Sequence, residues 1–382
     1  MRGTILIMAL IFVVPVQGQD SRIWKEAGSQ INLLYRETMD RRNEKRIFPR
    51  SEERDSLRLV GSGDWTSGFW PGILWLLFDY TKDAGWKSKA EEFTALMERE
   101  SRNRSSHDVG FKIYNSYGNG YKHGGREEYK AKILEGAATL ATRFNKKVGC
   151  IRSWDFEKWK YPVIIDNMMN LELLFAATKL SHDSSYYRIA VAHANTTMKN
   201  HYRKDYSSWH VVDYDTASGT VISKTTHQGY ANESVWARGQ AWGLYGYTMC
   251  YRETKNPVYL QQAEGIAEFF LHNPVLPADK IPYWDFSVAD TASEPRDVSA
   301  AAIMASALYE LKNYSKNGKR YKLFADEIML SLVKYYRAQP GTHHGFILLH
   351  STGNKPANGE IDVPIIYADY YFLEALARRD KK

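Results

Sequence analysis

Cysteine is almost absent from this sequence. Cys150 and Cys250 are the only two among 382 residues, so at most one disulfide could form and a disulfide-held scaffold is excluded. The spacings C-x-x-C and H-E-x-x-H are missing, as are G-x-S-x-G, the P-loop and G-x-G-x-x-G. Metal, serine-nucleophile and nucleotide chemistry are therefore disfavoured, and we expect neither a metal nor an organic cofactor.

Long hydrophobic runs are missing everywhere except at the N-terminus. Arg2 precedes an apolar run from Ile5 to Val16 and the small residue Gly18, which is a secretory signal pattern and too short for a membrane span. No cysteine follows this cleavage site, so a lipid anchor is not expected. We predict a signal peptide over 1–18, a single catalytic domain over 19–382, and a periplasmic or secreted protein. The alternative is a buried first helix.

The sequence also lacks any block of like charge. Its formal charge is +7, but basic residues are dispersed and mixed with acids, a distribution that disfavours nucleic-acid binding. The mild positive excess would attract acidic polysaccharides, although a solvated basic surface explains it equally well. Aromatics reach 14%, with 11 Trp and 26 Tyr, and such rings both fill cores and stack on sugars.

Amphipathic helical periodicity recurs along the whole chain. Strand-like alternation is confined to 207–230, read as a hairpin with a Ser-Gly turn, and to 345–353. Six helical hairpins in a ring would account for the helix count, which predicts an all-α (α/α)6 toroid with short β-hairpin insertions at its mouth. An open helical solenoid is the alternative, but no internal repeat is found. The predicted helices span 23–41, 67–83, 85–102, 108–120, 125–144, 163–181, 184–202, 233–254, 257–273, 296–313, 318–337 and 366–379.

Two aspartates stand at the beginning of predicted apolar helices, Asp166 in "VIIDNMMNLELLF" and Asp108 in "SSHDVGF". Aspartate is a favoured helix N-cap, so capping is the simpler interpretation of either residue alone. Asn167 and Asn170 add polar atoms to an otherwise apolar helix, which suggests a lined cavity. A carboxyl group in a poorly hydrated pocket near a second carboxylate has a raised pKa and can donate a proton near neutral pH.

The segment "THQGYANESVWARGQAWGLYGY" (225–247) concentrates polar and aromatic residues. With Asn232 as N-cap, Ser234, Arg238 and Trp242 would share one helix face. An arginine among small residues needs an anion, either a substrate carboxylate or a buried structural partner. His210, His227 and Gln228 offer further hydrogen-bonding groups nearby in sequence, and Trp65 stands in a polar loop where it could stack on a sugar or cover the core.

These segments resemble the unsaturated glucuronyl hydrolases, glycoside hydrolase family 88. The matching pieces run from about residue 60 to 375, and the third and fifth are the most specific: "DWTSGFWPG", "HDVGF", "IIDNMMNLELLF", "SWHVVDYD", "THQGYANESVWARGQAWGLYG" and "EIDVPIIYADYYFLEAL". The resemblance implies an (α/α)6 toroid without a metal or cofactor. It also implies a bacterial hydrolase acting on lyase-generated oligosaccharides that end in a 4,5-unsaturated uronate.

The resemblance assigns roles to residues of this sequence. Asp166 matches the general acid/base and Asp108 the second essential acid, while His210, Gln228, Arg238, Trp242 and Trp65 match positions that line the sugar subsite. Some members carry serines for the uronate where this chain has Pro364. Two alternatives stay open: an unsaturated rhamnogalacturonyl-type hydrolase or other (α/α)6 glycosidase, and an inactive carbohydrate-binding protein.

Overall fold

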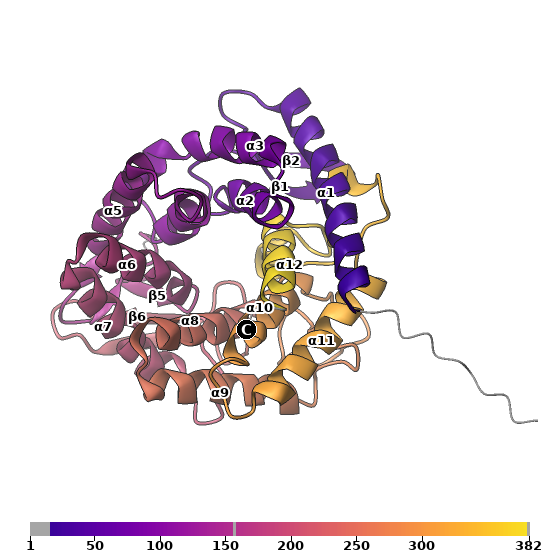
Figure 1. Ribbon diagram of the computed structural model, residues 1–382. Coiled ribbons are helices and arrows are strands. Elements are labelled where there is room, and N and C mark those ends of the chain that lie inside the picture. The colour runs from indigo at the N-terminus through magenta and orange to yellow at the C-terminus, as the bar shows by residue number, and fades with distance from the viewer. Residues whose placement is uncertain (1–15, 156–157, 380–382) are drawn as a thin grey trace, which may run out of the picture.

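Helices alternate between two concentric rings in the computed structural model, which describes residues 16–155 and 158–379 (Figure 1). The outer ring contains α1 (Val16–Arg41), α3 (Ala84–Ala95), α5 (Glu127–Ala141), α7 (Ser184–His201), α9 (Pro257–His272) and α11 (Gly318–Tyr335). The inner ring contains α2 (Phe69–Thr81), the π-helix η2 (Gly110–Gly118) with the one-turn α4 (Asn119–Tyr121), α6 (Asn167–Ser181), α8 (Ala237–Thr254), α10 (Val298–Leu311) and α12 (Ile366–Arg379). Because α12 packs against α2, the ring closes, and the predicted (α/α)6 toroid is confirmed.

The inner and outer helices differ in residue size and in how much of each helix is buried. Every residue of the inner helix α10 is buried, and its alanines let neighbouring backbones approach closely. In α8 the same role falls to glycine: a Cβ at Gly246 would lie 2.5 Å from the Cβ of Met168 on α6. The outer helix α11 instead buries a stripe that includes Tyr321, Ala325 and Ile328, the 3.6-residue period of a helix packed on one side.

Short strands connect the helices. β1 (Phe48–Glu53) pairs with β2 (Ser56–Val60), β3 (Phe144–Asn145) with β4 (Cys150–Ile151), and β5 (Pro162–Ile164) with β6 (Val211–Tyr214), which also pairs with β7 (Val221–Thr225). The predicted hairpin over 207–230 is confirmed as β6–β7. Its turn contains Gly219 at φ +79°, where a Cβ would lie 2.3 Å from the Lys147 carbonyl oxygen, so glycine is required there.

Several local predictions were wrong. The helix predicted over 85–102 is divided into α3, which ends at Ala95, and a 3-10 helix over Glu98–Arg102. The segment 345–353 forms isolated bridges instead of a strand, because the Asp369 carboxylate accepts the backbone N–H groups of Ile347 and Leu348. The predicted helix at 233–254 begins at Ala237 as α8, and Asn232 does not cap it: its side-chain oxygen accepts the N–H of Thr226.

The helix predicted from 163 begins at Asn167, because residues 162–164 pair with β6 as β5. Cys150 and Cys250 are both buried and free. Within the described ranges, no helix has the length and apolarity needed to cross a bilayer. The predicted signal peptide lies outside the described residues except for 16–18, which fall in α1.

Candidate active site

Asp166 is a buried carboxyl group with one oxygen left unpaired. It immediately precedes α6, yet its backbone is already helical and its side chain caps nothing. Only 8% of the residue is exposed, and Oδ2 has no hydrogen-bond partner among the described residues. Burial and, to a smaller extent, the negative charge of Asp108 raise its pKa to about 7, while the positive charge of Arg238 opposes the shift. Capping therefore does not explain this residue, whereas a carboxyl group with a pKa of about 7 can exchange a proton near neutral pH.

His210 faces Asp166 in a defined protonation state. Its Nδ1 accepts the backbone N–H groups of His227 and Gln228, each at 3.2 Å, so in the neutral ring the proton sits on Nε2. Burial lowers the pKa of His210 well below its usual value, which keeps the ring neutral. Nε2 lies 3.6 Å from Asp166 Oδ2 and has no closer partner in the described chain. The loop before α8 thus fixes a donor that points at the acid.

Asp108 is held by its own loop. Its Oδ2 accepts a hydrogen bond from Ser106 Oγ, and Oδ1 lies 3.4 Å from Nε2 of His107. The buried His107 ring in turn has its Nδ1 3.3 Å from Asn170 Nδ2 on α6. Asp108 and Asp166 are close enough for the charge of one to raise the pKa of the other.

The sequence setting of Asn167 and Asn170 suggested a lined cavity, but both amides bond to neighbouring segments of the protein. Asn167 Nδ2 donates to the Ile151 carbonyl at 2.9 Å, and Asn170 Oδ1 accepts the N–H of Phe111 in η2 at 3.0 Å. Both amides therefore join α6 to neighbouring segments. Their effect on the site is indirect, since they keep the Asp108 loop against the helix that carries Asp166.

Arg238 has a buried structural partner. Its Nη1 donates to Asp297 Oδ2 at 2.8 Å and to the Thr352 carbonyl, and Nη2 donates to the Gly353 carbonyl. The sequence offered a substrate carboxylate or a buried structural partner for this arginine, and the structure shows the buried structural partner. Its Nε has no partner in the described residues, and its charge opposes the raised pKa of Asp166. Ser234 lies outside α8 and donates to Asp285, so only Arg238 and Trp242 share the predicted helix face.

A cavity of about 190 Å³ lies beside these groups. Trp65 forms part of its wall and packs on Tyr367 with ring centroids 4.9 Å apart. Gln228 Nε2 donates to the Gly353 carbonyl at 3.1 Å, which joins the loop before α8 to the C-terminal segment. The cavity is lined by Arg50, Trp65, Trp154, His227, Gln228, Arg238, Gly353, Asn354, Glu360 and Tyr367.

Trp154 connects this cavity to the acid. Its ring lies edge-on to His210 at 6.0 Å between centroids, so the cavity wall continues to the ring that faces Asp166. Trp242 is fully buried beneath, 5.2 Å from the Phe111 ring, and its indole N–H has no hydrogen-bond partner in the part of the chain described. Unpaired buried polar atoms on Asp166, His210 and Trp242 are thus grouped at one end of the toroid, where they can meet the hydroxyl and carboxylate groups of a sugar.

The sequence did not single out Trp154, His107, Arg50, Glu360 or Tyr367. Arg50 binds Glu360 through two hydrogen bonds of 2.7 and 2.8 Å, and the two come from opposite ends of the chain. The position of His107 next to Asp108 was the only local signal available. Pro364 accepts the N–H of Glu52 through its carbonyl oxygen at 3.3 Å, so this position anchors β1 and offers no side-chain hydroxyl to a uronate. Among the described residues no group of three or more His, Cys, Asp or Glu side chains is arranged to hold a metal ion.

A toroid of helical hairpins with a buried, raised-pKa carboxylic acid near a sugar-sized cavity is the arrangement of a glycoside hydrolase. No protein-family model matches the chain, but curated relatives do. The chain is 54% identical over 338 residues to an unsaturated glucuronyl hydrolase of Formosa agariphila, and the match covers 87% of this chain and 84% of that one. It is 32% identical over 330 residues to an unsaturated chondroitin disaccharide hydrolase of Streptococcus agalactiae, covering 84% and 82%.

Among solved structures, one of an unsaturated glucuronyl hydrolase specific for heparin superposes with a TM-score of 0.90 at 48% identity, covering 94% of this chain and 97% of that chain. The chain therefore belongs to the unsaturated glucuronyl hydrolase family.

Proposed function

We propose that this enzyme removes the non-reducing terminal 4,5-unsaturated uronic acid from lyase-generated acidic oligosaccharides of the glycosaminoglycan type. One observation carries the proposal: the Asp166 carboxyl is buried beside the neutral His210 with one oxygen unpaired, and burial raises its pKa to about 7. A group of this kind can both donate and accept a proton near neutral pH.

The substrate contains an enol ether, because its C4=C5 double bond is joined to the ring oxygen. The proton of Asp166 passes to C4, and positive charge develops at C5 and the ring oxygen. The Asp166 carboxylate then takes a proton from water as the water oxygen bonds to C5. The resulting hemiketal opens to a ketone, the glycosidic link is released, and the acid is regenerated. One group acts first as acid and then as base, and each proton transfer contributes about 10²–10⁴-fold.

The remaining residues act by binding and positioning. The Nε2–H of His210 faces Asp166 and can donate to a substrate oxygen or to the carboxylate after proton transfer. Trp65 and Gln228 line the cavity and are placed to contact the sugar, while Trp242 supplies a buried indole N–H near the acid. Asp108 raises the pKa of Asp166 and lies at the same end of the toroid. Arg238 sets the local positive potential from its ion pair with Asp297.

The test is the loss of the ultraviolet absorbance of the C4=C5 bond. A panel of unsaturated disaccharides from heparin, chondroitin and hyaluronan, incubated with the wild type and with Asp166→Asn, should lose absorbance only with the wild type. The substitution should leave the protein folded. Turnover by Asp166→Asn at the wild-type rate would contradict the role of Asp166. Activity confined to unsaturated rhamnogalacturonan fragments would favour the alternative hydrolase, and binding without turnover by the wild type would favour the inactive binder.

We further propose that residues 1–18 are a signal peptide, that 19–382 form one catalytic domain, and that the enzyme works in the periplasm or outside the cell. The supporting pattern is Arg2, the apolar run Ile5–Val16 and Gly18. N-terminal sequencing of the protein from its native host tests the cleavage site. A mature chain that retains residues 1–18 would contradict this proposal without affecting the catalytic one.

A further inference from the structure

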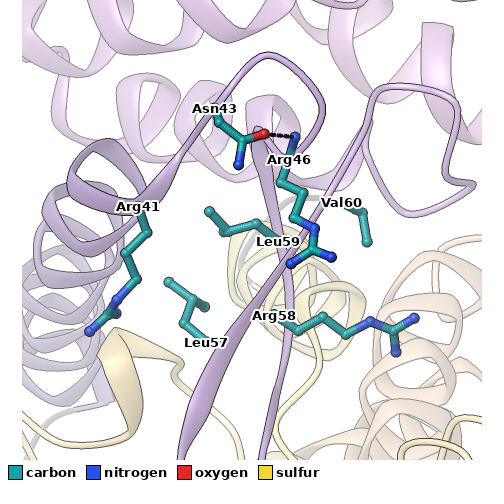
Figure 2. Close-up of a pocket in the computed structure, with 7 residues that line it drawn as sticks. All are labelled: Arg41, Asn43, Arg46, Leu57, Arg58, Leu59 and Val60. Carbon is teal, nitrogen blue, oxygen red and sulfur yellow. Dashed lines mark hydrogen bonds between the residues drawn. The ribbon is translucent and has the colours of Figure 1, made fainter.

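A second hollow lies at the edge of the β1–β2 hairpin, outside the active-site cavity. This groove encloses about 450 Å³, and its lining residues are Arg41, Asn43, Arg46, Leu57, Arg58, Leu59 and Val60. Figure 2 shows the three guanidinium groups spread around it, with Leu57 and Leu59 between them. All the ionisable side chains that line it are arginines, of which Arg41 pairs with Glu37 and Arg58 with Glu53. Planar guanidinium groups suit sulfate and carboxylate, and an aliphatic surface suits the face of a sugar ring.

Arg46 is the free cation of the groove. It is exposed and has no ion-pair partner anywhere in 16–155 or 158–379. Its backbone N–H is bound by the Asn43 side-chain oxygen at 3.0 Å, and the Asn43 N–H by the Arg46 carbonyl. This tight turn fixes the base of the Arg46 side chain and leaves the Asn43 amide nitrogen facing the groove (Figure 2). An amide N–H₂ and an unpaired guanidinium are both donors for an anion.

The groove adjoins the active-site cavity through one cluster of charges. Arg58 lines the groove and lies 3.3 Å from Glu360, which lines the cavity together with Arg50. Burial opposes the charge of Glu360, but hydrogen bonds from Arg50 keep its pKa below the usual value, so this carboxylate is neutralised on both sides. Arg50, Glu360 and Arg58 thus form a wall between the two hollows. Arg50 lines the cavity and Arg58 lines the groove.

The cavity is too small for more than the end of a chain. Its volume of about 190 Å³ is below the ~300–1,000 Å³ of pockets that enclose a whole small ligand, so the later sugars of an oligosaccharide must lie outside. Resting on the proposed function, we propose that the Arg41–Arg46–Arg58 groove binds the sulfate or carboxylate groups of these later sugars, and so gives the enzyme a preference for acidic oligosaccharides longer than a disaccharide.

The test compares an unsaturated disaccharide and an unsaturated tetrasaccharide, both made by lyase digestion of heparin. Each exposed guanidinium contact is worth about three-fold in affinity, so Arg46→Gln should raise KM for the tetrasaccharide about three-fold and Arg41→Gln/Arg46→Gln about ten-fold. KM for the disaccharide should not change, because it does not reach the groove. Lys25→Gln and Arg36→Gln, exposed on α1 but absent from the groove lining, give single and double controls of equal charge change.

Salt supplies a second measurement. The ratio of the double variant's KM to the wild-type KM for the tetrasaccharide should fall as NaCl is raised from about 50 to about 500 mM, because salt screens the charges. Equal changes in KM for both substrates, equal effects of the control variants, or no tetrasaccharide turnover by the wild type would overturn the groove proposal. Failure of the wild type on the disaccharide would instead overturn the proposed function. In that case titration calorimetry with the tetrasaccharide must still show weaker binding by the double variant, or the groove proposal fails too.

Discussion

Asp166→Asn should make the enzyme inactive and, at alkaline pH, more stable. The folded protein holds this carboxyl at a pKa of about 7, whereas an unfolded aspartate has about 3.9. The folded state therefore binds the proton more tightly, and ionising Asp166 costs stability progressively as pH rises between these two values. Asparagine is neutral at every pH and resembles the protonated acid in shape, so the variant escapes this cost.

The size of the effect follows from the shift. About three pKa units at 1.36 kcal/mol each correspond to about 4 kcal/mol of destabilisation that is complete by about pH 8.5. With ~2.1 cal/mol/K of unfolding entropy per residue, this amounts to roughly 5 °C in Tm for a chain of this length. The gain should disappear at about pH 4, where the wild-type carboxyl is protonated in the folded state and half-protonated in the unfolded one.

Differential scanning calorimetry at a series of pH values measures this directly. Asp40→Asn, a change of an exposed aspartate, controls for the change in net charge and should show no pH-dependent gain. If Asp166→Asn unfolds at the same temperature as the wild type at pH 8.5, or below it at every pH, the carboxylate is not desolvated and the reasoning for its role as a proton donor is refuted.

Three further predictions concern the surroundings of the acid and the fold. The wild-type kcat/KM should fall as pH rises through about 7, by about ten-fold per pH unit on the limb due to Asp166; a flat profile from pH 6 to 9 would contradict an acid of that pKa. Arg238→Ala leaves Asp297 buried without its partner and should lower the free energy of unfolding in urea by about 3–5 kcal/mol. Asp297→Asn leaves the Arg238 charge uncompensated and should move the pH midpoint of kcat/KM downward. Unchanged stability and an unchanged midpoint would show that the pair neither holds the site nor influences the acid. Gly219→Ala forces a side chain into φ +79° and against the Lys147 carbonyl, so it should lower stability by about 1–3 kcal/mol, and a variant as stable as the wild type would disprove the need for glycine in this turn.

Local patterns determined the helices of this protein. Apolar residues recur with helical period wherever a helix packs on one side, as along α11, and the even spacing of such segments was enough to predict the toroid. The same reasoning failed where side chains from distant segments take over backbone groups. Asp369 bonds the N–H groups of Ile347 and Leu348, and β6 pairs with residues 162–164. No local pattern reports such a partner.

The candidate acid could be named from sequence, through the family resemblance, but its chemistry could not. A residue before an apolar helix is a capping aspartate or a proton donor according to what surrounds it, and sequence alone left both open. Only the tertiary structure shows that the Asp166 side chain does not cap its helix, that it is buried, and that His210, Arg238 and Asp108 lie within electrostatic reach.

The sequence by itself determined the helices, because these follow from residue patterns within one segment. The number of helices along the chain predicted the ring, and the family resemblance pointed to the aspartate on which the proposed chemistry depends. The tertiary structure alone decided that Arg238 pairs with Asp297, that Asn167 and Asn170 are structural, and that Arg50 and Glu360 form a wall between the cavity and the arginine groove. These arrangements join residues tens to hundreds of positions apart, and a pKa or an ion pair depends on that spatial neighbourhood and on the water it excludes.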